Sequence, residues 1–204
     1  MESPNLAARH APATARNRDP ILAVLRDILP ASGLILEIAS GTGEHVRYFA
    51  EQLPGLDWQP TDPDPDALTS IAAWSHGLAN IRPPLRLNAS APDWPVAEAD
   101  AILCINMVHI SSWSATEGLF AGAARVLPPG APLYLYGPYR RADVPTAPSN
   151  EAFDQSLKAR DRAWGLRQME DIAALANRTG FGFERLIEMP ANNLSLVFRR
   201  SGPP

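Results

Sequence analysis

The chain alternates between two patterns of apolar residues. Short, mostly apolar runs typical of buried strands alternate with stretches in which apolar residues recur at helical spacing. This alternation predicts an α/β protein with a mostly parallel sheet and helices on both of its faces. The predicted strands cover residues 34–38, 56–62, 85–88, 99–106, 131–136, 181–188 and 194–198.

Helices are predicted before the first strand and between the later ones. Asp19 followed by Pro20 is typical of an N-cap and a first helical turn, so the first helix is expected to begin there and to end at Pro30. Only residues 189–193 separate the last two strands, which is too short for a parallel crossover and predicts an antiparallel pair. The other predicted helices cover residues 44–53, 63–74, 119–127, 150–162 and 168–179.

Composition narrows the class of protein. The 204 residues suffice for one well-buried domain, and 46% of them are hydrophobic, which predicts a globular core. A net charge of −4 argues against a nucleic-acid partner, which needs a concentrated basic face. The start of the sequence lacks the pattern of a signal peptide, and no apolar run reaches the ~20 residues of a membrane helix.

The chain contains one cysteine, Cys104. An intramolecular disulfide is therefore impossible, which fits a cytoplasmic protein. Cys104 lies inside an apolar strand and is interpreted as a core residue rather than as a nucleophile. His, Asp and Glu nowhere occur at a convincing metal-ligand spacing, so we expect a protein that works without a metal.

A glycine pair follows the first predicted strand. Gly41 and Gly43 precede a helix, and loops of this kind lie at the carboxyl ends of strands, where open α/β sheets bind ligands. A dinucleotide fingerprint needs a third glycine where this chain has Val46, and Glu44 would repel a phosphate at the helix N-terminus. S-adenosylmethionine (SAM) carries no phosphate. The loop therefore favours SAM over a dinucleotide.

Two acids accompany this loop. Asp62 ends the second strand, where it can accept hydrogen bonds from ribose hydroxyls or serve as the N-cap of the next helix. Glu37 lies inside the first strand, where a carboxylate is costly unless it is paired. It can order the glycine loop, receive the ammonium group of SAM, or lie exposed at an edge.

The sequence around the loop, residues 36–45, resembles motif I of class I SAM-dependent methyltransferases. More narrowly, the chain resembles the DUF938, or methyltransferase-like 26, family over nearly its whole length. The resemblance implies a Rossmann-like seven-stranded sheet, mostly parallel, with an antiparallel last strand. It rests on residues 15–17, 58–64, 106–110, 147–150 and 190–198.

The resemblance also implies roles for single residues on the cofactor side. Glu37, Gly41 and Gly43 would form the amino acid and ribose side of the pocket. Asp62, followed by Pro63, would bind the ribose. These positions match the family motif directly.

Further roles follow from the same resemblance. The dipeptide Asn88-Ala89 would lie near the adenine, although many class I enzymes have aspartate where this chain has Asn88. The dipeptide Asn106-Met107 would line the side from which the methyl group is transferred. Arg16 and Asn17 would close over the cofactor from a helical lid segment, residues 1–30, of a single domain covering residues 1–204.

Candidate substrate-binding residues lie after the fourth and fifth predicted strands. His109 can act as a general base in methyl transfer, or it can pack beside Trp113 in a structural turn. Tyr139 and Asn150 belong to a polar insertion, residues 137–164, that we expect on the substrate side. The pair Asn192-Asn193 is interpreted as turn residues.

Four functions remain open at this point. A SAM-dependent methyltransferase acting on a small molecule, as a monomer or homodimer, is the main hypothesis. A protein or RNA methyltransferase would need a basic or extended groove, for which Arg140-Arg141 is the only hint. A SAM-binding protein without catalysis is the third. A nicotinamide-dependent oxidoreductase is disfavoured by Val46.

Overall fold

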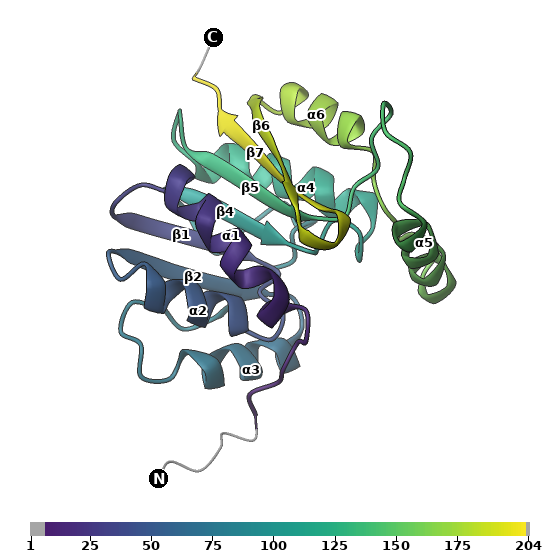
Figure 1. Cartoon of the computed structure of the whole chain (residues 1–204). Helices are drawn as coiled ribbons and strands as arrows, with labels where there is room; N and C mark the ends of the chain where they lie inside the picture. Colours follow the sequence, from purple (N-terminus) through teal and green to yellow (C-terminus); the bar gives the residue numbers. More distant parts are fainter. Residues whose placement is uncertain (1–6, 203–204) are drawn as a thin grey trace.

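The computed structural model describes residues 7–202. One sheet runs through the molecule with the strand order β3-β2-β1-β4-β5-β7-β6 (Figure 1). Strands β1 to β5 pair in parallel, whereas β7 pairs antiparallel with both β5 and β6. The predicted reversed last strand is therefore confirmed. The strands are β1 (Gly33–Ile38), β2 (Leu56–Asp62), β3 (Leu85–Arg86), β4 (Ala101–Ile105), β5 (Pro132–Gly137), β6 (Phe181–Met189) and β7 (Asn193–Arg200).

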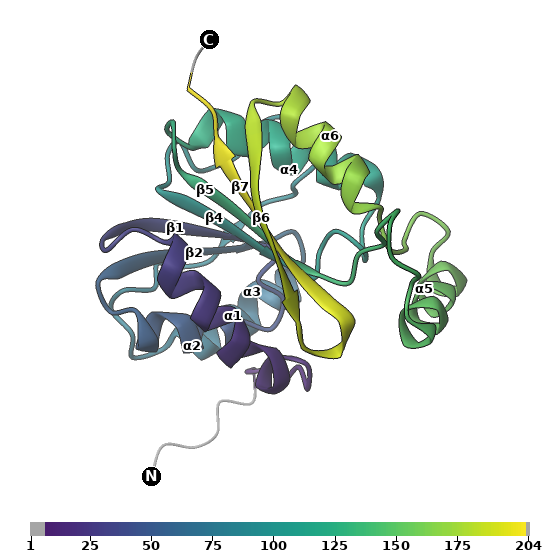
Figure 2. The same cartoon turned by 45° about the horizontal axis from the view of Figure 1, so that its top comes forward.

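Helices cover both faces of the sheet, because alternate residues of the central strands point to opposite sides. Ile35 of β1 packs in a core with the first three helices, whereas its neighbour Leu36 packs in a second core with α4 and α6. Helix α5 stands away from the sheet in both views (Figures 1 and 2). The helices are α1 (Thr14–Ile28), α2 (Glu44–Gln52), α3 (Pro65–Ser75), α4 (Trp113–Val126), α5 (Pro148–Arg160) and α6 (Met169–Arg178).

The predicted start of α1 is wrong. The helix begins at Thr14, so Asp19 is not its N-cap and Pro20 lies inside it. Thr14 and Asn17 are buried although both are polar, and for that reason the apolar pattern does not reveal the first turn. Pro20 has no N–H to donate to the Arg16 carbonyl, a loss the helix accommodates here. Residues 1–6 of the predicted lid lie outside the described residues.

The third strand is shorter than predicted. It ends at Arg86 because the side chain of Asn88 turns the chain, its Oδ1 accepting hydrogen bonds from the Ser90 N–H at 3.1 Å and the Ser90 hydroxyl at 2.8 Å. Cys104 is buried in β4, as predicted.

The sheet brings the candidate site to one edge, the one formed by the carboxyl ends of its parallel strands. The parallel strands β1, β2 and β4 all end there. In the antiparallel register Gly137 at the end of β5 faces Leu194 near the start of β7, so the β6–β7 turn lies at the same edge. The first turn of α1 lies beside that turn in both views (Figures 1 and 2).

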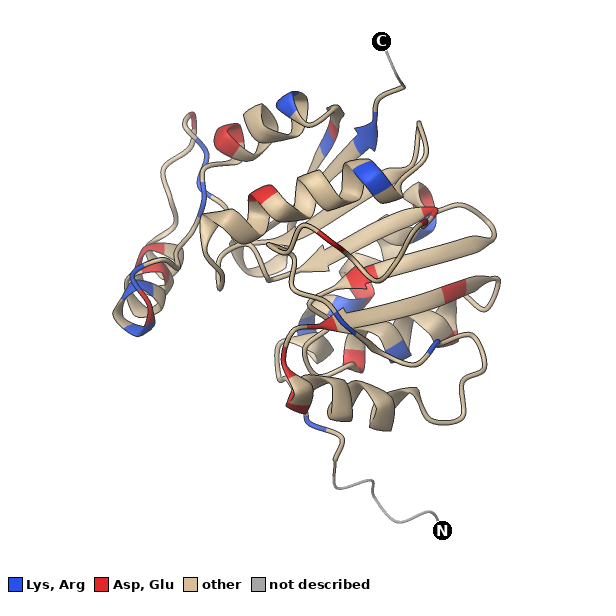
Figure 3. Ribbon diagram, turned by 180° about the vertical axis from the view of Figure 1, so that it is seen from behind, with Lys and Arg blue, Asp and Glu red and all other residues tan. Residues whose placement is uncertain are grey.

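The surface charge is mixed. Lys and Arg positions alternate with Asp and Glu positions along the drawn ribbon, most closely on α5 (Figure 3). Among residues 7–202, every helix is too short or too polar to cross a membrane.

Candidate functional site

The glycine loop after β1 depends on both of its glycines. Gly41 has a φ of 60° and Gly43 a φ of 91°, conformations that side chains rarely adopt. A Cβ at Gly43 would lie 2.7 Å from the Ile71 Cα, whereas a Cβ at Gly41 would meet nothing within 4 Å. The helix α3 therefore packs directly on the loop at Gly43, and the space beside Gly41 stays open.

The carboxylate of Asp62 ties the end of β2 to this loop. Its Oδ2 accepts a hydrogen bond from the Gly41 N–H at 2.9 Å, and its Oδ1 accepts one from the Asp64 N–H at 3.0 Å. Burial raises the pKa of Asp62, although both backbone donors lower it. The N-cap of α3 is Asp64, not Asp62, because the Asp64 carboxylate accepts from the Asp66 N–H. Asp62 thus keeps lone pairs for a ligand.

Glu37 is a buried carboxylate without a full set of partners. The side chain is 1% exposed, and its Oε2 makes no hydrogen bond within residues 7–202. Burial raises its pKa from 4.5 to about 7, against the lowering effect of a hydrogen bond with Ser40, and the charge of Asp62 adds to the rise. A cation bound here would satisfy the free oxygen and lower this pKa.

Asn17 connects α1 to the neighbouring elements. Its Oδ1 lies 2.8 Å from Nε2 of His45, near the start of α2. Burial raises the pKa of Tyr136, at the end of β5, and a side-chain hydrogen bond with Asn17 lowers it. Burial lowers the pKa of His45 to about 4, so its imidazole is neutral near pH 7. The first turn of α1 is thereby fixed over the ends of α2 and β5.

A cavity of about 590 Å³ opens at the same edge, beside Asn17 and Tyr136. Its walls come from the first turn of α1, the loops after β4 and β5, α5 and the β6–β7 turn. Five of the lining residues are asparagines, and none carries a carboxylate. The lining residues are Ala13, Arg16, Asn17, Asn106, His109, Tyr136, Pro138, Ser149, Asn150, Phe153, Pro190, Ala191, Asn192 and Asn193.

Asn106 directly follows β4 and has a φ of 65°, in the left-handed region that few residues other than glycine adopt. Its backbone N–H donates to the Tyr136 carbonyl at 2.8 Å, which holds this conformation. Its side-chain amide makes no hydrogen bond within residues 7–202. An uncommitted amide is therefore presented to the cavity at the end of a central strand.

His109 lies in the same wall and is 4% exposed. Burial, and then the positive charge of Arg167, lower its pKa to about 4. Its Nδ1 is buried without a hydrogen-bond partner among the described residues, and its ring lies 5.6 Å from that of Phe153 on α5. The ring is therefore a neutral imidazole near pH 7, and burial makes it a weaker base than a free histidine.

Helix α5 is attached mainly by polar contacts. The Arg140 guanidinium donates to both oxygens of Glu151 at 2.6 Å and to Asp154 at 3.0 Å. At its N-terminus, the Asn150 amide donates to the Asn192 carbonyl at 3.0 Å. The second bond joins α5 to the β6–β7 turn, so these two walls of the cavity are held together.

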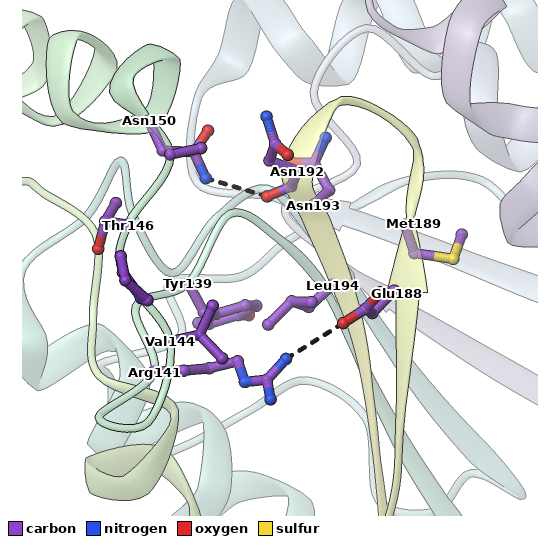
Figure 4. A pocket seen from close by; sticks show the side chains of 12 residues that line it. Tyr139, Arg141, Val144, Thr146, Asn150, Glu188, Met189, Asn192, Asn193 and Leu194 are labelled. Carbon is purple, nitrogen blue, oxygen red and sulfur yellow. Dashed lines mark hydrogen bonds and ion pairs between the residues drawn. The ribbon is translucent and has the colours of Figure 1, made fainter.

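A second, smaller cavity of about 180 Å³ lies on the other side of this bond (Figure 4). Its mouth carries an ion pair of 3.2 Å between Arg141 and Glu188. Asn150, Asn192 and Asn193 line both cavities. The bond between α5 and the turn therefore forms part of the wall that divides them.

The family of the chain follows from a match to a family model. Residues 8–200 match the model described as "Protein of unknown function (DUF938)". The chain belongs to the DUF938 family. The family description assigns no activity.

Solved structures similar to this DUF938 chain share its fold at low identity. An O-methyltransferase family protein from Burkholderia thailandensis superposes with a TM-score of 0.78 at 16% identity, covering 94% of this chain and 58% of its own. The mitomycin 7-O-methyltransferase MmcR gives a TM-score of 0.78 at 18% identity, with coverage of 93% and 54%.

A third structure is an O-methyltransferase family 2 protein from Planctomyces limnophilus in complex with apigenin. It gives a TM-score of 0.72 at 17% identity, covering 90% of this chain and 60% of its own. The DUF938 chain thus spans less than two thirds of the length of these three proteins. The likeness shows that it has the class I methyltransferase fold.

Some predicted site residues of the DUF938 chain lie apart from the large cavity. Trp113 lines a different cavity with Arg167, whose guanidinium is 6.0 Å from its ring. Tyr139 lines the smaller cavity, and its hydroxyl is buried without a partner among the described residues. Met107 and Ala89 are buried in the core, beneath α4.

Asn88 and Pro63 are exposed after β3 and β2. Asn88 Oδ1 is occupied by its own turn, so contact with an adenine would use the remaining atoms of the amide or of the backbone. Arg16, Asn17, Asn106, His109 and Asn150 come together in one cavity.

Nine of the fourteen lining residues are absent from the predicted site, among them Tyr136, Phe153 and Asn192. Tyr136 was interpreted only as a strand residue, and Phe153 only as part of a helix. Asn192 was interpreted as a turn residue, and the structure gives it a φ of 57° as well as a place in the cavity wall. Tyr136 and the turn both follow from the register of β5 with β7, which single-residue patterns do not contain.

Proposed function

We propose that this DUF938 chain is a SAM-dependent methyltransferase acting on a small molecule. The hydrogen bond from the Gly41 N–H to Asp62 carries the proposal, because it joins a glycine loop and an acid at the ends of adjacent parallel strands. Among the structures with the same fold is the methyltransferase CalO1, with S-adenosylhomocysteine bound.

The residues at this edge fit SAM chemically. The open space beside Gly41 admits a ligand close to the backbone, and Asp62 can accept hydrogen bonds from ribose hydroxyls. The unpaired Oε2 of Glu37 suits an ammonium group, such as that of the methionine end. When bound, SAM would supply an electrophilic methyl group.

The large cavity fits the acceptor. Its volume of about 590 Å³ lies within the usual range for small-molecule pockets. Asn106 can orient an O–H or N–H nucleophile, and the neutral His109 imidazole can take the proton that such a group loses. The mixed surface charge in Figure 3 supports a small acceptor over a nucleic acid.

Calorimetry with S-adenosylhomocysteine and with NAD⁺ tests the cofactor. We expect S-adenosylhomocysteine to bind in the micromolar range and NAD⁺ to show no binding. Binding of NAD⁺ without binding of S-adenosylhomocysteine would contradict the proposal, because the glycine loop would then bind a dinucleotide.

A further inference from the structure

The large cavity has an uneven charge. Within residues 7–202, its only permanently charged lining residue is Arg16, and no aspartate or glutamate lines it. The nearby acids are already engaged, since Glu151 binds Arg140 and Glu188 binds Arg141. A cationic ligand would therefore find no counter-charge in this cavity, whereas an anion would find one.

The guanidinium of Arg16 makes no hydrogen bond or ion pair within residues 7–202. Two nearby arginines are engaged, because Arg9 pairs with Asp64 at 3.9 Å and Arg18 makes a cation–π contact 4.5 Å from the centre of the Tyr48 ring. The backbone beneath Arg16 is fixed, since the next residue, Asn17, is buried and bound to His45. The structure thus places an exposed arginine with an uncommitted guanidinium on the cavity wall, on a backbone that is fixed.

The asparagine side chains on the cavity walls also divide into those that are hydrogen-bonded to the protein and those that are free. Asn17, Asn150, Asn192 and Asn193 spend side-chain hydrogen bonds on the protein itself. Among these five asparagines, Asn106 alone keeps its whole side-chain amide free within the described residues. The cavity therefore offers an uncommitted cation on α1 and, after β4, an uncommitted amide beside the neutral imidazole of His109.

We propose that the methyl acceptor is a compact molecule with a carboxylate, and that Arg16 binds this carboxylate while Asn106 and His109 hold the nucleophile. The inference rests on the proposed function and adds the substrate class to it. A guanidinium can donate two parallel hydrogen bonds to one carboxylate, which gives orientation as well as affinity. SAM itself also has a carboxylate, so the test must separate the two sources.

The test uses three probes with the same phenol ring: para-hydroxybenzoate, para-hydroxybenzamide and para-hydroxybenzylamine. Calorimetry on the full chain saturated with S-adenosylhomocysteine measures each affinity. We expect the acid to bind about tenfold more tightly than the amide, as a charge-assisted hydrogen bond implies. The cationic amine is expected to bind more weakly than the amide.

Variants of Arg16 assign the effect to its side chain. Arg16→Gln should remove the preference for the acid, and Arg16→Lys should restore part of it because it restores the charge. Arg162→Gln is the matched control, since it removes an exposed arginine outside the cavity and should preserve the preference.

The outcomes separate the two proposals. Equal binding of the acid and the amide would overturn the acceptor class. Absence of acid binding at about 10 mM, roughly the weakest dissociation constant that calorimetry resolves, would overturn it as well. A loss of more than tenfold in affinity for S-adenosylhomocysteine in Arg16→Gln would also overturn it, because the guanidinium would then serve the cofactor. Failure of the unchanged protein to bind S-adenosylhomocysteine would instead contradict the proposed function.

Discussion

Two halves of one sheet edge differ in chemistry. At the ends of β1 and β2 the polar groups are carboxylates, Glu37 and Asp62, packed close to a glycine loop with positive φ angles. At the ends of β4 and β5 they are mainly asparagine amides, together with one neutral histidine and one arginine. Acids suit a ligand with hydroxyl and ammonium donors, whereas amides and a cation suit one rich in acceptors.

The two halves also differ in how they are held. The loop half is fixed by hydrogen bonds from backbone N–H groups, such as the one from the Gly41 N–H to the Asp62 carboxylate. The amide half is assembled from distant segments, as in the bond between Asn150 and Asn192. The comparison teaches that one half is built from neighbouring β-α units, whereas the other joins segments that lie farther apart in the chain.

The largest expected effect concerns Glu37, whose pKa is about 7 in the folded chain against an ordinary 4.5. Between these values the folded chain binds more protons than the unfolded chain, so the free energy of unfolding falls as pH rises. The full difference corresponds to about 3 kcal/mol. Glu37→Gln should therefore be stabilised relative to the unchanged protein, by about 3 kcal/mol more at pH 8 than at pH 4.5, in urea unfolding.

Comparing the Glu37→Gln variant with the unchanged protein isolates the contribution of residue 37 to the pH dependence of stability. His45 and His109, with pKa values lowered to about 4, change stability in the opposite direction, but they do so in both proteins. Glu98→Gln makes the same chemical change on the surface and serves as a control. A stability difference that does not depend on pH would contradict a buried, unpaired carboxylate at residue 37.

The next largest effect tests the role of Asp62 in binding the cofactor. Asp62→Ala removes the acceptor proposed for the ribose and the bond to Gly41, so the affinity for S-adenosylhomocysteine should fall by more than about tenfold. Asp64→Ala removes the N-cap of α3 together with the exposed ion pair to Arg9, and it should cost about 1 kcal/mol of stability with little change in affinity. If the two variants bind equally well in calorimetry, the contrast between them disappears.

The smallest effect concerns the other half. Asn150→Ala leaves the Asn192 carbonyl without its donor and should lower the free energy of unfolding by about 1 kcal/mol. Amide hydrogens of α5 should exchange faster, because the helix loses its tie to the β6–β7 turn. Ser149→Ala, which removes a more exposed partner of Asn192, is the milder control. Unchanged exchange in α5 would mean that the remaining contacts, such as those of Arg140 and Ser149, suffice to hold the helix.

The sequence predicted the strands, the reversed last strand and the glycine loop because each rests on a local pattern. Apolar runs marked the strands, and Gly41 and Gly43 marked the loop that the structure holds at positive φ. The first turn of α1 was missed because it buries Thr14 and Asn17, which are polar. Periodicity of apolar residues carries no signal for such a turn.

The residues that line the large cavity were predicted only in part. Asn106, His109 and Asn150 could be named because they follow predicted strands or lie in a long insertion. Tyr136 and the β6–β7 turn could not, since their place depends on the pairing of β5 with β7. Trp113 was expected beside His109, but it lies in a neighbouring cavity because α4 begins with it and Arg167 packs against it.

The bond between Asn150 and Asn192 also matters for redesign. Two short stretches, 138–165 and 189–193, supply most of the wall around the acceptor, and neither contributes to the glycine loop. If the proposed function holds, exchanging them between relatives would alter the acceptor while sparing the methyl donor. Because the bond crosses from one stretch to the other, the two must be exchanged together as a matched pair.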